Sequence, residues 1–250
     1  MAAQRLQLEL RPRAGDTLRM RLDQITEMSG TRKGAAAKSV VTTLHMFSRA
    51  IVESTTPTSA LIVAITDSVN VNTSDEHTRP LAEQTIRQLE GRTLRLRLSP
   101  DGTVAVAGEA ASVPREVNEI VSIMPASFPR DPVAVGDTWV REMPIPPGTR
   151  LGVPAGSVVR SSFRLDSLGR RGDVAYVSMH GTLQRTNAPT ADGGLGGSVN
   201  GTMVVDRRRG WLSESRFIVQ LQTTVISAAA TAAPTQVRMK ITQHMRVVPR

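Results

Sequence analysis

The side chains that could bind a metal or transfer a proton are few and widely separated in this sequence. Its four histidines are His45, His77, His180 and His244, and the chain has no cysteine. A zinc site needs several imidazole or thiolate ligands at short, characteristic spacings, and no two of these histidines have such a spacing. The sequence therefore predicts no metal site and no cofactor, and we expect the strand histidines to face water.

Paired carboxylates are the next chemistry to consider. Asp166, Asp173, Asp206 and Glu214 could form the acid pair of a glycosidase. However, aspartate is common at the ends of hairpins, and aromatic residues, which usually line a carbohydrate site, make up only 3% of the chain. We predict no catalytic residue and a protein that is not an enzyme. A hydrolase with an unrecognised site is the second alternative.

Two glycine-containing segments resemble nucleotide-binding loops only superficially. Residues 34–39, Gly-Ala-Ala-Ala-Lys-Ser, lack the glycine that precedes the lysine of a phosphate-binding loop, and a strand pattern follows where that loop needs a helix. Residues 193–197 have the wrong spacing for dinucleotide binding, because Val199 occupies the third glycine position. Both segments are interpreted as loops.

The charge of the chain does not indicate a nucleic-acid partner. The net charge is +9, and 28 of the 31 basic residues are arginine, because only Lys33, Lys38 and Lys240 are lysine. The arginines are dispersed, and in residues 94–98 they alternate with leucine, which places them on the solvent face of a strand. A single-strand binder would interleave cations with aromatic residues, so we predict no nucleic-acid binding.

Alternation of apolar and polar residues dominates the chain and predicts antiparallel strands with one buried face. The pattern is clearest near the C-terminus, where Val237, Met239, Ile241, Met245 and Val247 share one face. In the first predicted strand Leu18, Met20 and Leu22 point inward. Strands are predicted at residues 17–28, 39–54, 59–72, 93–98, 103–107, 136–143, 158–165, 174–184, 199–205, 211–226 and around 237–247.

Helical periodicity is scarce. Residues 114–124 carry apolar side chains at i, i+3, i+4 and i+7, with Pro114 and Pro125 at the two ends, and a second short helix is predicted at residues 80–90. Both helices are expected to cover an apolar face or an open end of the sheet. The fold class predicted is mainly β: a long, strongly curved antiparallel sheet, a half-barrel or open barrel, with one or two short covering helices.

The order of these elements divides the chain near its middle. Residues 1–125 form the N-terminal β half, residues 126–155 a crossover rich in proline and glycine, and residues 156–250 the remainder of the C-terminal half, which the strand at residues 136–143 opens. Gly15-Asp16-Thr17 and Gly136-Asp137-Thr138 each open a strand, so the sequence favours two similar halves. The alternative is that Gly-Asp-Thr is simply a common turn into a strand.

Compartment is predicted from the start of the chain and from its composition. Residues 1–4, Met-Ala-Ala-Gln, resemble what remains after signal-peptide cleavage with a methionine added, so we expect a periplasmic or secreted protein whose signal peptide has been removed. The alternative is an ordinary cytoplasmic start. The longest apolar stretch, residues 60–65, is too short to span a bilayer. The sequence therefore predicts no transmembrane segment.

Gly136-Asp137-Thr138-Trp139 and the late hairpin Val204-Val205-Asp206-Arg207-Arg208-Arg209-Gly210-Trp211-Leu212 resemble segments of exported bacterial proteins and lipoproteins of the lipoprotein-carrier (LolA-like) group. The resemblance implies a curved half-barrel whose concave apolar face is covered by short helices and holds acyl chains. It matches no ligand-contacting residue, so no binding residue is assigned. The cysteine that carries the lipid in a lipoprotein is absent.

Two interpretations follow for function. In the first, the protein is non-enzymatic and binds or carries a lipid or another apolar molecule in the cell envelope; in the second, it is a structural or interaction module whose sheet faces are packed solid. Long strands must curve, and an unfilled apolar concavity binds apolar ligands. Trp139 and Trp211, which begin strands, are expected to be core anchors.

Overall fold

The computed structural model describes residues 5–32, 38–108, 127–144, 157–185, 196–225 and 235–249. In these ranges the chain forms one antiparallel sheet of eleven strands in the order β5-β4-β3-β2-β1-β11-β10-β9-β8-β7-β6. Chain neighbours are sheet neighbours throughout, except that the chain passes from β5 at one edge to β6 at the other. This confirms the predicted mainly β fold. The strands are β1 Thr17–Arg32, β2 Lys38–Thr55, β3 Ala60–Thr73, β4 Thr93–Leu98, β5 Val104–Val106, β6 Thr138–Pro144, β7 Ser157–Gly169, β8 Val174–Arg185, β9 Gly196–Asp206, β10 Trp211–Val225 and β11 Thr235–Val248.

Helical structure is short in the part of the chain that is described. The helix predicted at residues 80–90 is confirmed as α1, Arg79–Leu89, and two 3-10 turns, η1 Glu76–Thr78 and η3 Arg170–Gly172, accompany it. α1 contacts β3, beyond the part of β3 that pairs with β4, and so it covers a stretch of strand edge that would otherwise be free to pair with another chain. The helix predicted at residues 114–124 lies outside the described residues.

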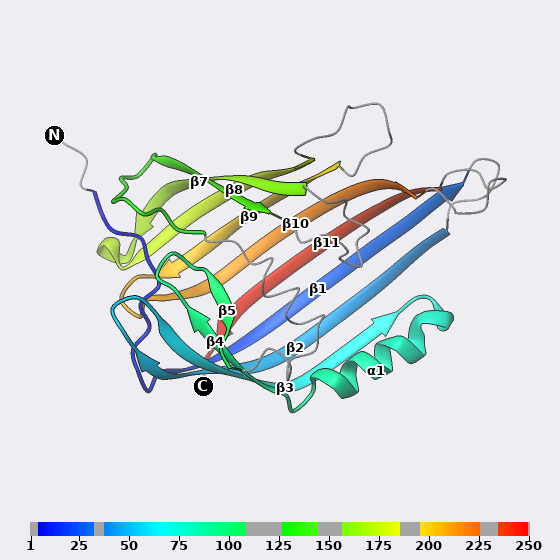
Figure 1. The fold of residues 1–250 in the computed structure, drawn as a ribbon, viewed down its shortest axis with the longest axis horizontal. Coiled ribbons are helices and arrows are strands. Elements are labelled where there is room, and N and C mark those ends of the chain that lie inside the picture. The colour runs from blue at the N-terminus through cyan, green and yellow to red at the C-terminus, as the bar shows by residue number, and fades with distance from the viewer. Residues whose placement is uncertain are drawn as a thin grey trace.

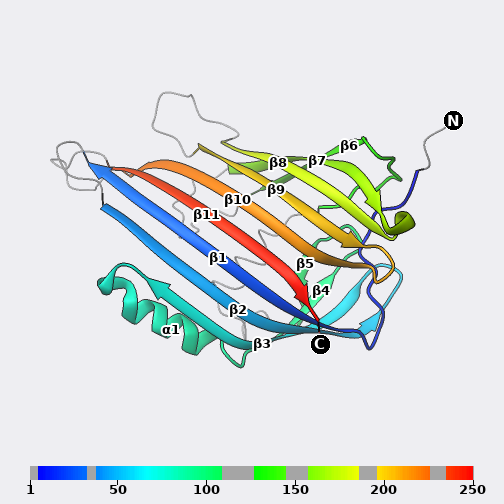
Figure 2. The ribbon, with the colours of Figure 1, turned by 180° about the vertical axis from the view of Figure 1, so that it is seen from behind.

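The sheet is open and curved. In Figure 1 β4 and the edge strand β5 lie in front of the central strands, and in the opposite view of Figure 2 they lie behind them. The pairing register shifts after Val52 in β2, after Leu165 in β7 and after Leu212 in β10. Such bulges bend a strand and increase its twist, which explains how strands of up to eighteen residues wrap around one core.

The two faces of the sheet differ in composition. We call the face that contains Leu18 and Leu22 of β1 the inner face, and the opposite face, which contains Asp23, the outer face. Near the start of β1 the inner face is filled: Leu18, Val52 and Phe163 are buried there. Burial of these aliphatic and aromatic side chains, each contributing about 1.5–3 kcal/mol, is the main stabilising term of the fold.

Two segments outside the strands fill this end of the inner face. In the N-terminal segment, residues 5–12, Leu6, Leu8 and Leu10 are buried, and Leu6 forms a bridge with Val133. The second segment, residues 127–134, contributes Phe128, which is also buried. The core of the protein therefore lies between one half of the sheet and these two segments, and we call that half of the inner face the filled half.

The turns at residues 15–17 and 136–138 have the same local structure. In each, the glycine has a positive φ (88° and 95°) and its N–H donates to a carbonyl of the next strand, that of Val52 or of Leu165. In each, the aspartate accepts a hydrogen bond from the backbone N–H three residues earlier. A register shift follows both Val52 and Leu165. The division of the chain at residues 126–155 stays a prediction.

Candidate ligand-binding face

The inner face continues beyond the filled half as a broad apolar surface. Met28 of β1 lies directly opposite Met239 of β11 and Val40 of β2, and Leu221 of β10 lies opposite Met239. Met28 is 44% exposed, and the other three side chains are half-buried. We call this region the partly exposed half. Aliphatic and methionine side chains on strands give a surface that adapts to ligands of different shape.

The next row of the same face, one step closer to the filled half, is also largely apolar. Ile241 of β11, Val219 of β10 and Val199 of β9 lie side by side across three strands, and all three are half-buried. Because adjacent strands lie about 4.8 Å apart, the two rows form a contiguous area that is apolar over β9 to β11, while the second row continues into Thr26 of β1 and Thr42 of β2. Such an area is the kind of feature that marks a binding surface.

Glycines on the inner face make room for the larger side chains beside them. A Cβ atom added to Gly201 of β9 would lie 2.2 Å from Cδ1 of Phe217, and one added to Gly197 would lie 2.8 Å from Cδ2 of Leu221. Each glycine therefore lets the neighbouring side chain of β10 lie flat against the sheet. The inner face at this place is shaped by the absence of side chains on β9.

One cation lies on the inner face among these apolar groups. Trp139 of β6 stacks on Phe163 with ring centroids 5.8 Å apart, and Arg141 follows two residues later on the same face, opposite Ser161. Nε1 of Trp139 donates to the carbonyl of Ser127 at 2.9 Å, and the Arg141 guanidinium donates to the carbonyl of Phe128. Nε of Arg141 is buried and has no hydrogen-bond partner.

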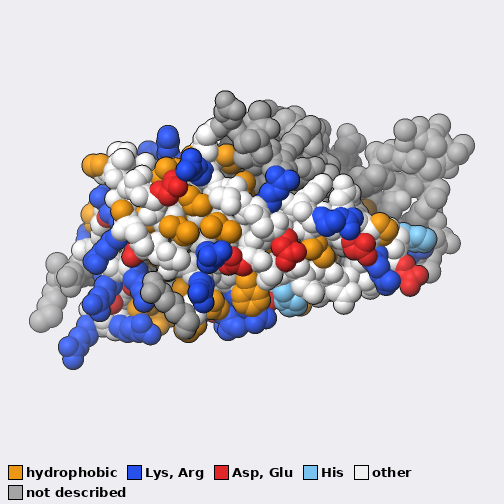
Figure 3. All heavy atoms as spheres, turned by 90° about the horizontal axis from the view of Figure 1, so that it is seen from below, with side chains coloured by type: hydrophobic (Ala, Val, Ile, Leu, Met, Phe, Trp, Pro, Cys, Tyr) orange, Lys and Arg blue, Asp and Glu red, His pale blue; other side chains and the backbone are white. Residues whose placement is uncertain are grey.

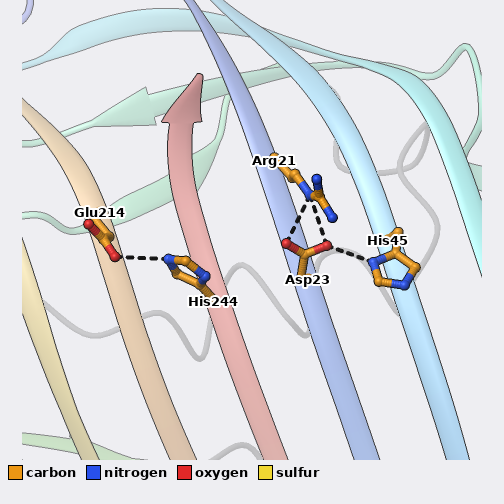
Figure 4. Close-up of polar contacts among 5 residues, drawn as sticks. All are labelled: Arg21, Asp23, His45, Glu214 and His244. Atoms are coloured by element: carbon orange, nitrogen blue, oxygen red, sulfur yellow. Dashed lines mark hydrogen bonds and ion pairs between the residues drawn. The ribbon is translucent and has the colours of Figure 1, made fainter. Parts of the chain in front are cut away.

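The outer face carries a cluster of charged side chains on adjacent strands (Figure 4). Asp23 of β1 accepts hydrogen bonds from Arg21 at 3.0 Å and shares one with Nδ1 of His45, on β2, at 2.6 Å. On β10 and β11, Glu214 contacts Arg216 and His244, each at 2.9 Å. Figure 4 shows the two groups on neighbouring strands, with Asp23 between Arg21 and His45 and with Glu214 beside His244.

These contacts change the acidity of the two carboxyl groups. Burial disfavours the charged form of Asp23, but the hydrogen bonds from Arg21 and His45 outweigh it, so the pKa of Asp23 is lowered. For Glu214, burial is likewise outweighed by hydrogen bonds from His244 and Arg216, and its pKa is also lowered. Both groups are therefore ionised near neutral pH, unlike a general acid, whose pKa is raised.

A hollow of about 880 Å³ lies at the far end of β1 and β9 to β11. Most of its lining residues lie on the outer face, including Glu27, Gln220, Gln222 and Lys240. Glu27 and Lys240 form an ion pair at 3.0 Å. The hollow therefore lies mainly on the outer face and is mostly polar. Met28, Leu221 and Met239 of the partly exposed half also line it, so it borders the apolar surface of the inner face.

Charged side chains of both signs are interspersed over the surface. Figure 3 shows, from below, Lys and Arg side chains lying among Asp and Glu side chains, with apolar groups between them. Several such neighbours form ion pairs, for example Arg49 with Asp67 at 2.7 Å and Arg95 with Glu53 at 3.2 Å.

The residues that the sequence singled out do not assemble into one site. His45, His180 and His244 lie on the outer face of β2, β8 and β11, and His77 lies in η1. No group of three or more metal-ligating side chains occurs within the described ranges. The predicted carboxylate candidates are held separately: Asp166 accepts from the Ser178 hydroxyl and Asp206 from the backbone N–H of Arg209.

The remaining candidates lie in elements of the fold or outside the described residues. Trp211 is buried in the core. Trp139 is half-buried and packs against the core, so both tryptophans lie as expected of core anchors. Gly196 and Gly197 begin β9, whereas residues 193–195 lie outside the described ranges. Of residues 34–39, Lys38 and Ser39 begin β2 and the others also lie outside those ranges. No described helix is both long enough and apolar enough to cross a membrane.

Comparison with known proteins places the fold but not the family. No family model matches the chain, and no curated protein matches it by sequence. A solved structure described as "Lipid-protein interactions in lipovitellin" is similar with a TM-score of 0.59 at 12% identity, covering 96% of this chain and 26% of the other. The chain thus spans about a quarter of the lipovitellin chain. At this identity the likeness shows the fold: a large, open antiparallel sheet.

Two bacterial structures are less similar. An outer membrane channel from Pseudomonas putida F1 has a TM-score of 0.25 at 10% identity, covering 96% of this chain and 98% of the other. A LolA superfamily protein from Nitrosomonas europaea has a TM-score of 0.14 at 8% identity, covering 94% and 88%. Neither value supports a shared fold, so the LolA-like resemblance stays a hypothesis.

Sequence reasoning missed two features of the inner face. The buried N-terminal segment was not predicted, although Leu6, Leu8 and Leu10 alternate with polar residues and this period of two was a usable signal. Arg141 was also missed. Arg141 lies on the inner face because it follows Trp139 by two residues in β6. This strand is too short for its sequence pattern to show which of its two faces is buried.

Proposed function

We propose that this protein is an exported, non-enzymatic binder of a lipid or another apolar molecule in the bacterial cell envelope, and that the ligand lies on the partly exposed half of the inner face. The observation that carries the proposal is the continuous set of half-buried aliphatic and methionine side chains around Met28 and Met239. A protein that leaves such an area in contact with water loses the stabilisation that burial provides. A bound apolar ligand restores it.

The likeness to lipovitellin supports the proposal indirectly. That solved structure is described by its lipid–protein interactions, and a sheet of similar fold occurs there. In the present chain the filled half has its own plug of leucines, so binding is assigned only to the half of the inner face that the plug leaves free.

The direct test is native mass spectrometry of the purified protein for a co-purified lipid, followed by titration with a fluorescent acyl probe. Two double variants provide a matched comparison. Met28→Lys with Met239→Lys places two charges on the inner face, where these residues lie opposite each other. Ile25→Lys with Ile218→Lys places two charges on the outer face, at residues 42% and 41% exposed.

We expect the inner-face variant to weaken probe binding at least about tenfold, because each methionine buried by a ligand contributes about 1.5–3 kcal/mol. The outer-face variant should bind as the wild type does. Equal effects of both variants, or wild-type protein that binds no lipid and no probe, would instead favour a structural module with a solid core. Cell fractionation tests export: protein found in the cytoplasm only would contradict that part of the proposal.

A further inference from the structure

Arg141 is exceptional on the inner face because of its charge. Away from the strand ends, the inner-face positions of the described strands carry no other Lys or Arg, as the alternation from Trp139 through Phe163 and across the sheet shows. Its neighbours in the same row are Ser161 and Gly181, both small and buried. β6 is an edge strand, so Arg141 has one neighbouring strand, β7, which presents Ser161, and β8 beyond it presents Gly181.

No carboxylate of the described strands neutralises this cation. The acidic side chains of regular strand positions belong to the outer face, and those beside bulges have partners away from the inner face. In the first group are Asp23, Glu27, Glu142, Asp206 and Glu214; in the second are Glu53 with Arg95, Asp67 with Arg49, and Asp166 with Ser178.

The hydrogen bonds of Arg141 leave part of its binding capacity unused. A guanidinium has five N–H donors, and one nitrogen donates to the carbonyl of Phe128, while Nε is buried without a partner. Trp139 already holds the same segment through the carbonyl of Ser127, so fixing this segment does not by itself require an arginine. Buried charges are normally compensated by an ion of opposite sign, and the guanidinium fork suits a carboxylate or a phosphate.

Space for such a group exists beside the arginine. A hollow of about 660 Å³ lies between residues 129–133 and β6, and Arg141 and Trp139 are among its lining residues. Its two acidic side chains, Asp131 and Asp137, are matched in number by Arg5 and Arg130, and Arg5 pairs with Asp137 at 3.6 Å. With Arg141 included, the lining of the hollow has a net positive charge.

The row that starts at Arg141 leads to the partly exposed half. It runs across the inner face through Ser161, Gly181, Val199 and Val219 to Ile241. Five strand intervals of about 4.8 Å make this path about 24 Å long. A long alkyl chain lying along it would contact the apolar side chains of β9 to β11 while its head stays at β6.

We propose that Arg141 binds the anionic head, a carboxylate or a phosphate, of an amphiphile whose alkyl chain lies on the inner face. The inference rests on the proposed function and narrows it: the ligand is an acidic lipid and not a neutral one. The site combines a guanidinium that no carboxylate of the described strands neutralises, a hollow beside it, and a row of side chains leading away from it that is buried at Ser161 and Gly181 and half-buried from Val199 to Ile241.

The test compares ligands that share a chain and differ in the head. Dodecanoate, dodecyl phosphate, dodecanol and inorganic phosphate are titrated into the purified full chain by calorimetry. We expect dodecanoate and dodecyl phosphate to bind about tenfold to a hundredfold more tightly than dodecanol, because a hydrogen bond to a charged group is worth about that factor. Inorganic phosphate, which has no chain, should bind far more weakly.

Substitution of Arg141 then tests whether this residue causes the preference for an anionic head. Arg141→Gln should reduce the affinity for the two anions to that for dodecanol and leave dodecanol unchanged, whereas Arg141→Lys should keep a reduced preference for anions. Arg160→Gln removes a charge from the outer face of the adjacent strand, where Arg160 is exposed and lies opposite Glu142, and should have no effect. Urea unfolding of each variant verifies that it is folded.

Several results would overturn the inference. Equal affinity of the wild-type chain for dodecanoate and dodecanol would do so without any variant, as would an anion preference that survives in Arg141→Gln. Binding of inorganic phosphate as tight as that of dodecyl phosphate would point to a free-anion site instead. If the wild-type chain binds neither dodecanol nor the two amphiphilic anions, the proposed function itself fails.

Discussion

Gly210, in the turn between β9 and β10, is the position where a single methyl group should disturb the plug of the filled half. Its φ is +63°, and a Cβ atom added there would lie 2.1 Å from the carbonyl oxygen and 2.4 Å from the carbonyl carbon of Arg11. Both atoms belong to the backbone of the N-terminal segment. Because backbone cannot rotate away as a side chain can, Gly210→Ala must push this segment off the sheet.

The cost has two parts that can be separated. An L-residue in the left-handed region costs roughly 1–2 kcal/mol, and overpacking against a fixed neighbour typically costs about 1–3 kcal/mol more. Gly15→Ala is the matched control: its φ is +88°, yet no atom lies within 4 Å of the added Cβ. It should show only the first part, so the difference between the two variants measures the collision with Arg11.

Thermal unfolding gives the assay. In a chain of this size about 1 kcal/mol corresponds to a change in Tm of about 2–4 °C, so Gly15→Ala should lower Tm by about 2–8 °C and Gly210→Ala by about 4–20 °C. Displacement of Leu6, Leu8 and Leu10 should also increase binding of an apolar dye in Gly210→Ala alone. Equal Tm values for the two variants would refute the contact between Gly210 and the N-terminal segment.

Three further predictions follow from the two sheet faces. Gly201→Ala should destabilise the protein by about 1–3 kcal/mol in urea unfolding, because its Cβ would lie 2.2 Å from Phe217, whereas Gly196→Ala, with no atom within 4 Å, should not. Trp139→Phe keeps the stack on Phe163 but loses the bond to Ser127, and should cost about 1 kcal/mol in the same assay. The pKa of Asp23 is lowered in the folded protein, so its contribution is present above the unfolded value of about 3.9 and is lost as pH falls through the folded pKa. The stability difference between wild type and Asp23→Asn should therefore shrink as the pH is lowered from neutral through that range, and a constant difference would contradict the role of the Arg21 and His45 contacts.

The strands could be predicted because their signal is local. Alternation in β11 needs no long-range information, and β4, Thr93–Leu98, has the predicted bounds. Strand ends were less accurate: β7 extends to Gly169, beyond the predicted residue 165, because a register shift after Leu165 lets pairing with β8 continue. A bulge inserts one extra residue into the strand and so interrupts the alternation of apolar and polar residues. The sequence pattern therefore stops at the bulge, although the strand continues beyond it.

The candidate site was beyond sequence reasoning for a different reason. Apolar alternation identifies a buried face, but it does not say which part of that face a plug covers, since coverage depends on contacts between distant segments such as Leu6 with Val133. The same limit applies to Arg141, whose environment is set by Ser127 and Phe128 and by strands far along the chain.

The two similar turns, at residues 15–17 and 136–138, are evidence on whether the two halves of the chain arose by duplication. The turns at residues 15–17 and 136–138 each begin a strand that pairs with the next one, and in both cases the acceptor, Val52 or Leu165, directly precedes a register shift. If Gly-Asp-Thr were simply a common turn, this would explain the glycine and the aspartate. It would not explain why, in both cases, the partner strand has a bulge directly after the residue that accepts the hydrogen bond. The matching bulges therefore favour a duplicated unit.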